Sequence, residues 1–146
     1  MDFSSNGIDL LKQLESVRYK PYKDFGGKWT VGVGHLIVPG DGCTIQDIIG
    51  TAQVDSLLKH DVQEVVECIN THVTSSINQN QFDALVIFVF NIGVGAFLAS
   101  TLLRLLNEGN YEGASLQFAR WNKVNGVDNL GLDHRRLAEK IFFLTP

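Results

Sequence analysis

The sequence lacks an apolar run long enough to cross a bilayer. Its longest uninterrupted apolar stretch covers residues 84–90, whereas a membrane-spanning helix needs roughly 18 or more apolar residues. The N-terminus also lacks a basic patch followed by an apolar run, so we expect no signal peptide. We therefore expect a protein without stable membrane insertion.

An excess of positive charge is also missing. The chain carries 12 Lys and Arg against 16 Asp and Glu, which gives a net charge of −4. With a pI near 5.5 and no basic helix pattern, we expect no binding to nucleic acid. Attraction to an anionic partner would have to be local, and five cations lie close together in one segment: Lys12, Arg18, Lys20, Lys23 and Lys28.

Cysteine and histidine are scarce and widely spaced. Cys43 and Cys68 could form one bridge, but without a secretory signal we expect both to be reduced. Cys68 lies in a helical pattern of apolar residues and is predicted to be a small core residue. The four histidines lack the spacing of a metal-ligand set, and we interpret His35 as a strand-end residue that bonds locally. We expect no metal and no cofactor.

The pattern of apolar residues predicts an α+β fold that is mainly helical. A chain of 146 residues corresponds to one domain, or to two lobes that share a core. We expect a helix that begins near Ser5 or Asn6, a small β-hairpin or sheet around residues 18–38, and helices in the rest of the chain. Thr44 and Asp47 form a possible capping box, with a restart near Gly50 and Thr51 as the alternative. The expected later helices cover residues 54–69, 82–90 (ended by Gly93), 102–106 (stopped at Gly109), 111–121 and 132–144.

One predicted strand has an unusual composition. Trp29, Val31 and Val33 alternate with Thr30 and two glycines, which predicts one bulky face and one face of small residues. A strand with glycine on one face allows a ligand or another backbone to approach closely. We therefore expect Thr30 to lie on the face that is free of bulk.

Glu15, Asp24 and Thr30 fall within a single helix–loop–strand segment. A glycosidase needs two carboxyl groups on separate elements. One must be protonated to donate to the departing oxygen, and the other must be ionised to stabilise positive charge, to steer water or to attack. Different surroundings must separate their pKa values. Glutamates at helix ends and aspartates in turns are more often solvated without a catalytic role, so this assignment is a hypothesis.

The same segment resembles the catalytic signature of the phage-type lysozymes, which are muramidases of glycoside hydrolase family 24 used as endolysins by tailed phages. Glu15 is followed by eight residues and Asp24, then by five residues and Thr30, and then by Val31-Gly32-Val33-Gly34-His35. Further matches extend over nearly the whole chain, at Ser4–Ile8, Asn78–Leu85, Phe90–Gly93, Gly95–Leu103, Arg120-Trp121 and Gly131–Glu139.

The resemblance implies a lysozyme-like catalytic domain over residues 1–146. It implies a sheet-bearing lobe at about 15–50, a bridging helix at about 52–72 and a helical lobe at about 75–146 that includes the N-terminal helix, with the substrate cleft between the lobes. Glu15, Asp24 and Thr30 would be catalytic. The family's saccharide-contacting positions fall on Leu36, Phe90, Asn91, Ser100, Ser115 and Arg120. For Arg135 and Arg136, a structural salt bridge, for example with Glu139, and substrate contact remain equal alternatives.

The implied function is hydrolysis of the β-1,4 bond between N-acetylmuramic acid and N-acetylglucosamine in peptidoglycan, which lyses the host cell. We expect a monomer that stays in the host cytoplasm until a holin-like membrane protein gives it access to the wall. A tail-associated role during phage entry is the alternative biology. Three other classes remain possible, namely a lytic transglycosylase, a non-catalytic glycan-binding module and a helical interaction protein.

Overall fold

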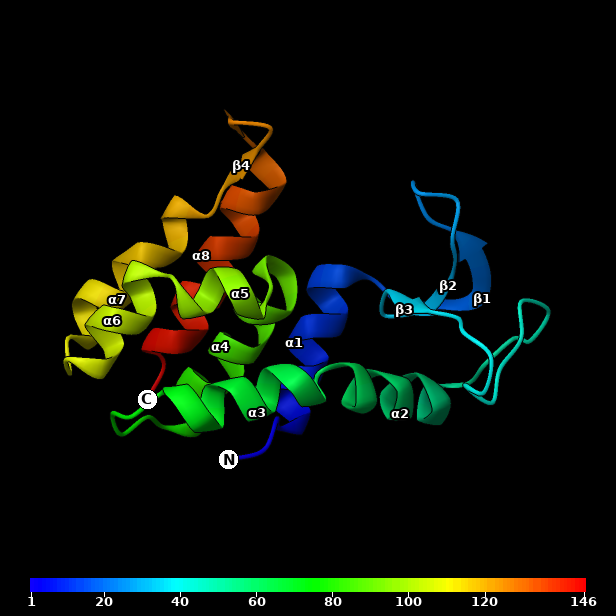
Figure 1. The fold of residues 1–146 in the computed structure, drawn as a ribbon, viewed down its shortest axis with the longest axis horizontal. Helices are drawn as coiled ribbons and strands as arrows, with labels where there is room; N and C mark the ends of the chain where they lie inside the picture. Colours follow the sequence, from blue (N-terminus) through cyan, green and yellow to red (C-terminus); the bar gives the residue numbers. More distant parts are fainter. The chain divides into compact units, whose positions relative to one another are not determined.

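The computed structural model describes all 146 residues, and the chain forms two compact units. We call residues 8–63 the sheet unit, and residues 1–7 together with residues 64–146 the helical unit. Figure 1 shows the elements of both units along the chain. None of the helices combines the length and the apolar composition that crossing a membrane requires.

The sheet unit contains a three-stranded antiparallel sheet. Its strands follow one another in the order β1-β2-β3, with a register irregularity in β1 between Arg18 and Tyr22. Helix α2 contacts β2 and β3 (Figure 1). The expected sheet at residues 18–38 is therefore confirmed. The bounds of the elements are α1 (Ser5–Glu15, whose first turn belongs to the helical unit), β1 (Arg18–Lys23), β2 (Trp29–Gly32), β3 (His35–Leu36) and α2 (Thr51–Asp61).

The prediction that Gly32 and Gly34 lie along one continuous strand is wrong. Strand β2 ends at Gly32, and both glycines have a φ of +67°, a conformation that side chains with a Cβ rarely adopt. The chain therefore turns over Val33 and Gly34 and returns as β3, where His35 pairs with Val31. The two glycines make a tight reversal possible, and they do not form an open face on a strand.

The expected alternation of faces in β2 is also absent. Val31 is fully buried, as predicted, but Thr30 is buried too, with 4% of its surface exposed. Trp29, which was expected on the bulky buried face, is half-buried, and the Lys23 ammonium lies 5.4 Å from the centre of its ring. Neighbouring elements therefore cover this short strand on both sides.

The helix expected from Val54 to Ile69 is present in two segments. Helix α2 ends at Asp61, Val62 caps it, and α3 (Gln63–His72) follows at once. The expected capping box at Thr44 and Asp47 is wrong. The Thr44 N–H does donate to Asp47 Oδ2 at 2.7 Å, but the Asp47 N–H bonds the Thr44 carbonyl and not its side chain, and no helix follows this turn. Helix α2 begins instead at Thr51 after Gly50, as the alternative predicted.

Helix α4 (Gln79–Ile92) is the core of the helical unit. Its residues 82–89 are all buried, and Gly93 ends it with a φ of +94°, so the expected helix and its expected end are confirmed. Asn78 and Gln81 form a reciprocal capping box at its start, in which each side chain accepts from the other residue's backbone N–H. Because both side chains satisfy backbone donors, this apolar helix has a defined first residue.

The rest of the helical unit packs around α4. Helix α8 packs directly against α4 (Figure 1). The ring of Phe118 packs edge-on against the rings of Phe88 and Phe143, with 4.9 and 5.5 Å between the ring centres. A small β4–β5 hairpin, which the sequence pattern did not predict, precedes α8. The remaining bounds are α5 (Val94–Leu98), α6 (Thr101–Asn107), α7 (Tyr111–Gln117), the 3-10 helix η1 (Phe118–Arg120), β4 (Lys123–Val124), β5 (Val127–Asp128) and α8 (Leu130–Leu144).

Candidate active site

Glu15 is the last helical residue of α1 and is half-buried. The helix ends at once because Ser16 takes a left-handed conformation, with a φ of +66°, while its N–H bonds to the Lys12 carbonyl at 2.9 Å. Lys12 also forms an ion pair with Asp55 of α2. The end of α1, and with it the backbone of Glu15, is therefore tied into the sheet unit.

Asp24 begins the tight turn between β1 and β2. Its backbone N–H donates to the Lys28 carbonyl, and one of its carboxylate oxygens, Oδ1, accepts from the Lys28 N–H, both at 2.9 Å. The Gly27 N–H closes the turn on the Asp24 carbonyl at 2.9 Å. Asp24 is exposed, so the structure holds a solvent-facing carboxylate in a fixed orientation.

Thr30 lies in β2, directly after this turn. Its hydroxyl donates to the Lys28 carbonyl at 3.1 Å. Because the hydroxyl proton is used in that bond, the oxygen is left as an acceptor. Leu36 of β3 pairs with Thr30 across the sheet, and its side chain is exposed. The sheet unit thus brings Asp24, Thr30 and Leu36 onto neighbouring strands and one turn.

The helical unit gathers three of the predicted saccharide contacts around Trp121. One pocket, of about 280 Å³, includes Asn91, Arg120 and Trp121 in its lining. The other lining residues are Ile92, Lys123, Leu132 and Arg136. A second pocket, of about 350 Å³, is lined by Ser100 and by the same Arg120 and Trp121. Residues from α4, η1 and the start of α6 therefore share one region of this unit, although they lie far apart in the sequence.

The other two predicted contacts of this unit have different surroundings. Ser115 of α7 is buried, and its hydroxyl donates to the Glu112 carbonyl at 2.7 Å. Phe90 is half-buried near the end of α4. Neither residue lines the two pockets around Trp121.

Arg135 and Arg136 both bind Glu139 within α8, which confirms the expected salt bridges. Arg135 Nε donates to Glu139 at 3.2 Å, and Arg136 Nη1 donates to the other carboxylate oxygen. Burial raises the pKa of Glu139, although both guanidinium groups act in the opposite direction. Arg136 also bonds Asn91 Oδ1 and lines the 280 Å³ pocket. It therefore orients a predicted contact residue, a role that sequence reasoning missed.

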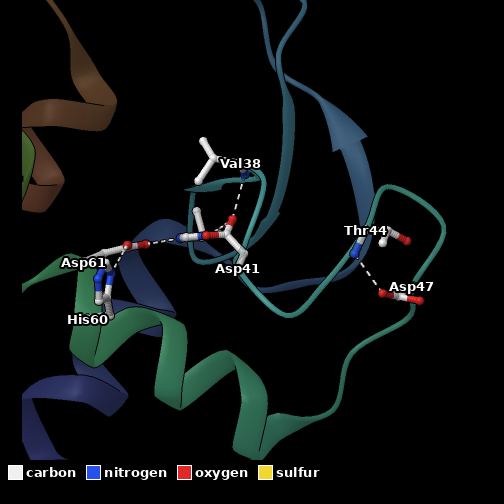
Figure 2. Close-up of polar contacts among 7 residues, drawn as sticks. Val38, Asp41, Thr44, Asp47, His60 and Asp61 are labelled. Atoms are coloured by element: carbon white, nitrogen blue, oxygen red, sulfur yellow. Dashed lines mark hydrogen bonds and ion pairs between the residues drawn. The ribbon is translucent and has the colours of Figure 1, made fainter.

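His35 bonds to Asp41, six residues further on, which fits the expected local bonding, but it also bonds to Asp61, 26 residues further on, which was not predicted. Its Nδ1 lies 2.7 Å from a carboxylate oxygen of Asp61 at the end of α2. Its Nε2 lies 2.8 Å from a carboxylate oxygen of Asp41, in the loop that follows β3. Figure 2 shows these two carboxylates on the loop and the helix, with Asp41 also bonded to the Val38 N–H and Asp61 beside His60. Neither aspartate belongs to a recognisable motif, so only the folded chain could reveal them.

The charges of this cluster shift the pKa values of His35 and Asp41. Burial, the largest single influence, lowers the His35 pKa, but hydrogen bonds and charge from Asp41 and Asp61 outweigh it, and the pKa is raised above 6.5. The Val38 N–H and then the His35 ring hold the pKa of Asp41 below 3.8. The His35 ring thus connects β3, the 38–42 loop and α2.

The fold defines a mainly helical α+β protein of the lysozyme-like class. A solved structure of a mutant of the Salmonella phage P22 lysozyme matches it with a TM-score of 0.93 and 41% identity over 99% of both chains. The muramidase domain of SpmX from Asticaccaulis excentricus matches with a TM-score of 0.88 and 36% identity, again over 99% of both chains.

Sequence comparison agrees with the fold. The family model described as phage lysozyme matches residues 12–139. The endolysin of Acyrthosiphon pisum secondary endosymbiont phage 1 is 42% identical over 98% of both chains, and the endolysin of Salmonella phage P22 is 41% identical over 97% of this chain and 98% of the relative. The chain belongs to the phage lysozyme family. As a member, it is a glycoside hydrolase that degrades peptidoglycan and lyses the host cell.

Proposed function

We propose that Glu15, Asp24 and Thr30 carry out hydrolysis of the β-1,4 bond between N-acetylmuramic acid and N-acetylglucosamine. The observation that carries this assignment is the turn between β1 and β2. It holds an exposed carboxylate on the backbone N–H of Lys28 and a threonine hydroxyl on the backbone carbonyl of the same residue. Catalysis is faster when the reacting groups are already held in the right geometry before the substrate binds.

Asp24 has the features of the ionised partner in the reaction. The Lys28 N–H fixes its Oδ1 by a hydrogen bond at 2.9 Å, and its exposed carboxylate is accessible to substrate. In the proposed mechanism this carboxylate stabilises the oxocarbenium-like centre, either by positioning water or by attacking the anomeric carbon. The orientation imposed by the turn restricts which side of the sugar ring Asp24 can approach.

Thr30 and Glu15 complete the proposed reaction. Since the Thr30 hydroxyl donates to Lys28, its oxygen can accept a hydrogen bond from the attacking water or a substrate hydroxyl. Glu15, half-buried at the end of α1, donates a proton to the glycosidic oxygen as the bond breaks. A lytic transglycosylase would need only the acid, so it would leave the Asp24–Thr30 arrangement without a purpose.

We further propose that Leu36, Phe90, Asn91, Ser100, Ser115 and Arg120 contact the saccharide. The grouping of Asn91, Ser100 and Arg120 in two pockets around Trp121 supports three of them. For Asn91, the bond to Arg136 fixes the side-chain oxygen, so its amide N–H groups are the donors left for substrate. Ser115 has the weakest support because its hydroxyl is already bonded within α7.

The proposed biology follows from the family resemblance. The protein would act as a monomer, wait in the host cytoplasm and reach the wall through a membrane lesion made by a holin-like protein. Expression in host cells with and without such a protein tests this dependence, because lysis without any partner would contradict it. Copurification of the protein with intact virions would support the tail-associated role instead.

Digestion of purified peptidoglycan in water labelled with heavy oxygen tests the reaction itself. Hydrolysis adds one labelled oxygen to the new reducing end, whereas a transglycosylase produces an unlabelled anhydro sugar. Mass analysis of the released muropeptides separates these outcomes. No release of muropeptides at all would favour the non-catalytic glycan-binding module.

A further inference from the structure

Phe25 is the one exposed phenylalanine among the nine in the chain. Five of the others are completely buried, and the remaining three are half-buried. Phe25 has a relative exposure of 113%, so its ring makes almost no contact with the rest of the protein. Single apolar side chains are common on protein surfaces, so it is the place of this ring, next to Asp24 on an ordered turn, that points to a ligand contact.

The exposure of this ring results from an ordered turn. Phe25 lies between Asp24 and Gly26, and three hydrogen bonds of 2.9 Å between Asp24, Gly27 and Lys28 close the turn on both sides of it. The turn therefore presents the ring outward in the folded state. It also presents the ring one residue from a carboxylate to which the proposed function gives a catalytic role.

Gly26 shows how closely the turn fits around that carboxylate. A Cβ added at Gly26 would lie 3.3 Å from Asp24 Oδ1, which is tighter than most such contacts. The residue after Phe25 is thus one without a side chain, and the space beside Asp24 stays open to a ligand. A ligand bound at Asp24 would then have the Phe25 ring as a close neighbour.

The hairpin around Phe25 is positively charged in an acidic protein. Residues 18–32 contain four cationic side chains and one acidic side chain, for a local charge of +3 against −4 for the whole chain. Lys23 and Lys28 lie at the two ends of the turn, and both are exposed. This surface complements an anionic partner that also offers a flat, partly apolar face.

We propose that Phe25 binds the apolar face of a sugar ring of the peptidoglycan strand, while Lys23 and Lys28 attract the carboxylates of its peptide stems. The inference rests on the proposed function, because it uses the assignment of Asp24 to the reacting sugar. Aromatic side chains are the usual anchors of such contacts. The hairpin is then a substrate-positioning surface, and Phe25 determines affinity for the glycan.

The turn favours a glycan over a lipid surface as the partner. Insertion of Phe25 into a bilayer would bring the exposed Asp24 carboxylate and the polar backbone of two glycines toward the apolar region, where such groups are costly. A glycan has hydroxyl and amide groups that can bond these same polar groups. A membrane partner is therefore the competing outcome of the test.

Co-sedimentation with purified sacculi tests the proposal in a Glu15→Gln background, where binding is measured without hydrolysis. Phe25→Ala is expected to weaken binding about 5- to 10-fold, and Phe25→Trp is expected to restore it. Ile48→Ala is the matched control, because Ile48 is another exposed apolar residue of the sheet unit, at 75% exposure. Melting temperatures should be equal in all variants. Equal binding by Phe25→Ala and its parent would overturn the proposal.

Two further probes distinguish the role of the Phe25 ring from that of the two lysines, and distinguish glycan binding from membrane binding. On glycan strands stripped of peptide stems by an amidase, the Phe25→Ala effect should persist. The effect of a Lys23→Ala, Lys28→Ala double variant should shrink, because only the lactyl carboxylate of each N-acetylmuramic acid is left as an anion. Loss of the Phe25→Ala effect on stripped strands would overturn the sugar contact. Vesicles of phosphatidylglycerol and phosphatidylethanolamine should bind no variant, and Phe25-dependent vesicle binding would assign the ring to a membrane instead.

A separate measurement tells failure of this inference from failure of the proposed function. Hydrolysis of the same sacculi is followed by the release of reducing ends for the wild type and for Glu15→Gln. If Glu15→Gln remains fully active, the proposed function fails whatever Phe25 does. If Glu15→Gln is inactive but Phe25→Ala binds normally, only the role of Phe25 is wrong.

Discussion

Asp24 and Thr30 are joined through a single carbonyl group. The Asp24 backbone N–H and the Thr30 hydroxyl both donate to the Lys28 oxygen, at 2.9 and 3.1 Å. Because the acceptor belongs to the backbone, the arrangement depends on the length and conformation of the turn and does not depend on the Lys28 side chain. Asp24 and Thr30, which we assign to the same reaction, are therefore positioned by hydrogen bonds to the same backbone carbonyl.

Thr30→Val should separate catalysis from stability. Valine keeps the β-branched shape but deletes the hydroxyl, so the bond to Lys28 is lost at a cost of about 1 kcal/mol in unfolding free energy. Turnover should fall much more than that, by roughly 100-fold if the hydroxyl orients the reacting water. Thr30→Ser should retain most of the activity. Turbidity assays and thermal melts of both variants measure the two effects, with the exposed Thr71→Val as control.

A Thr30→Val protein that lyses cells normally would remove Thr30 from the mechanism. The companion change, Trp29→Ala, should cost less than the roughly 3–5 kcal/mol that is typical of a fully buried aromatic residue, because Trp29 is only half-buried. Denaturant unfolding of this variant measures the loss.

Glu15→Gln should abolish lysis while the protein stays folded. Glutamine keeps the shape of the side chain but cannot donate the proton, and general acid catalysis is typically worth about 10²–10⁴-fold. Glu108→Gln is a suitable control, because Glu108 is an exposed glutamate paired with Arg104 on the surface. Muropeptide release and circular dichroism of both variants are the measurements. Near-normal activity of Glu15→Gln would exclude Glu15 as the acid.

The His35 cluster should make stability depend on pH. Because the pKa of His35 is raised in the folded state, the contribution of His35 to the free energy of unfolding is complete below pH 6.5. This contribution is lost as the pH rises through the folded-state pKa. The lowered pKa of Asp41 means that its contribution is present above 3.8 and is lost as the pH falls through the folded-state pKa. The cluster therefore stabilises the fold most between pH 3.8 and 6.5.

Asp41→Asn tests this dependence because it keeps the shape and removes the charge. We expect a loss of about 1–3 kcal/mol in unfolding free energy at pH 5, since the hydrogen bonds to the His35 ring and the Val38 N–H lose the carboxylate charge, and a smaller loss at pH 9. Denaturant titrations at the two pH values measure the difference. An equal loss at both would show that the ionisation of His35 is not involved.

The sequence predicted those parts of the fold that depend on local pattern. The buried run of α4 and its end at Gly93 follow from composition and from the left-handed conformation that glycine tolerates. The break at Val62 and the turn over Gly32 and Gly34 were missed, because the same residues fit a longer helix and a longer strand equally well. Periodicity alone does not determine where such an element stops.

The candidate site shows the same limit. Glu15, Asp24 and Thr30 form a spacing that can be recognised along the chain, whereas one partner of His35 and the partner of Asn91 come from distant segments. Asp41, Asp61 and Arg136 have no local signal, since their roles arise only when a loop or a helix folds against another element. The burial of Thr30 likewise depends on neighbours that the strand pattern does not encode.

Ser16→Gly should stabilise the protein. A residue with a Cβ pays roughly 1–2 kcal/mol for the left-handed conformation that Ser16 adopts after α1, and glycine does not. Part of this gain is lost because glycine makes the unfolded chain more flexible, so we expect a net increase of about 1 kcal/mol. Gln13→Gly, at an exposed position inside the same helix, should instead cost about 1 kcal/mol. Thermal melts of the two variants should shift in opposite directions.

Cys43 and Cys68 are both free and buried, and one lies in each compact unit. Burial raises the pKa of both thiols, helped by Asp41 and Asp47 for Cys43 and by Glu64 for Cys68. Neither thiol should therefore react with an alkylating reagent until the structure around it opens. The native sequence thus carries two built-in reporters, and the order in which mass spectrometry finds them labelled would tell which unit opens first.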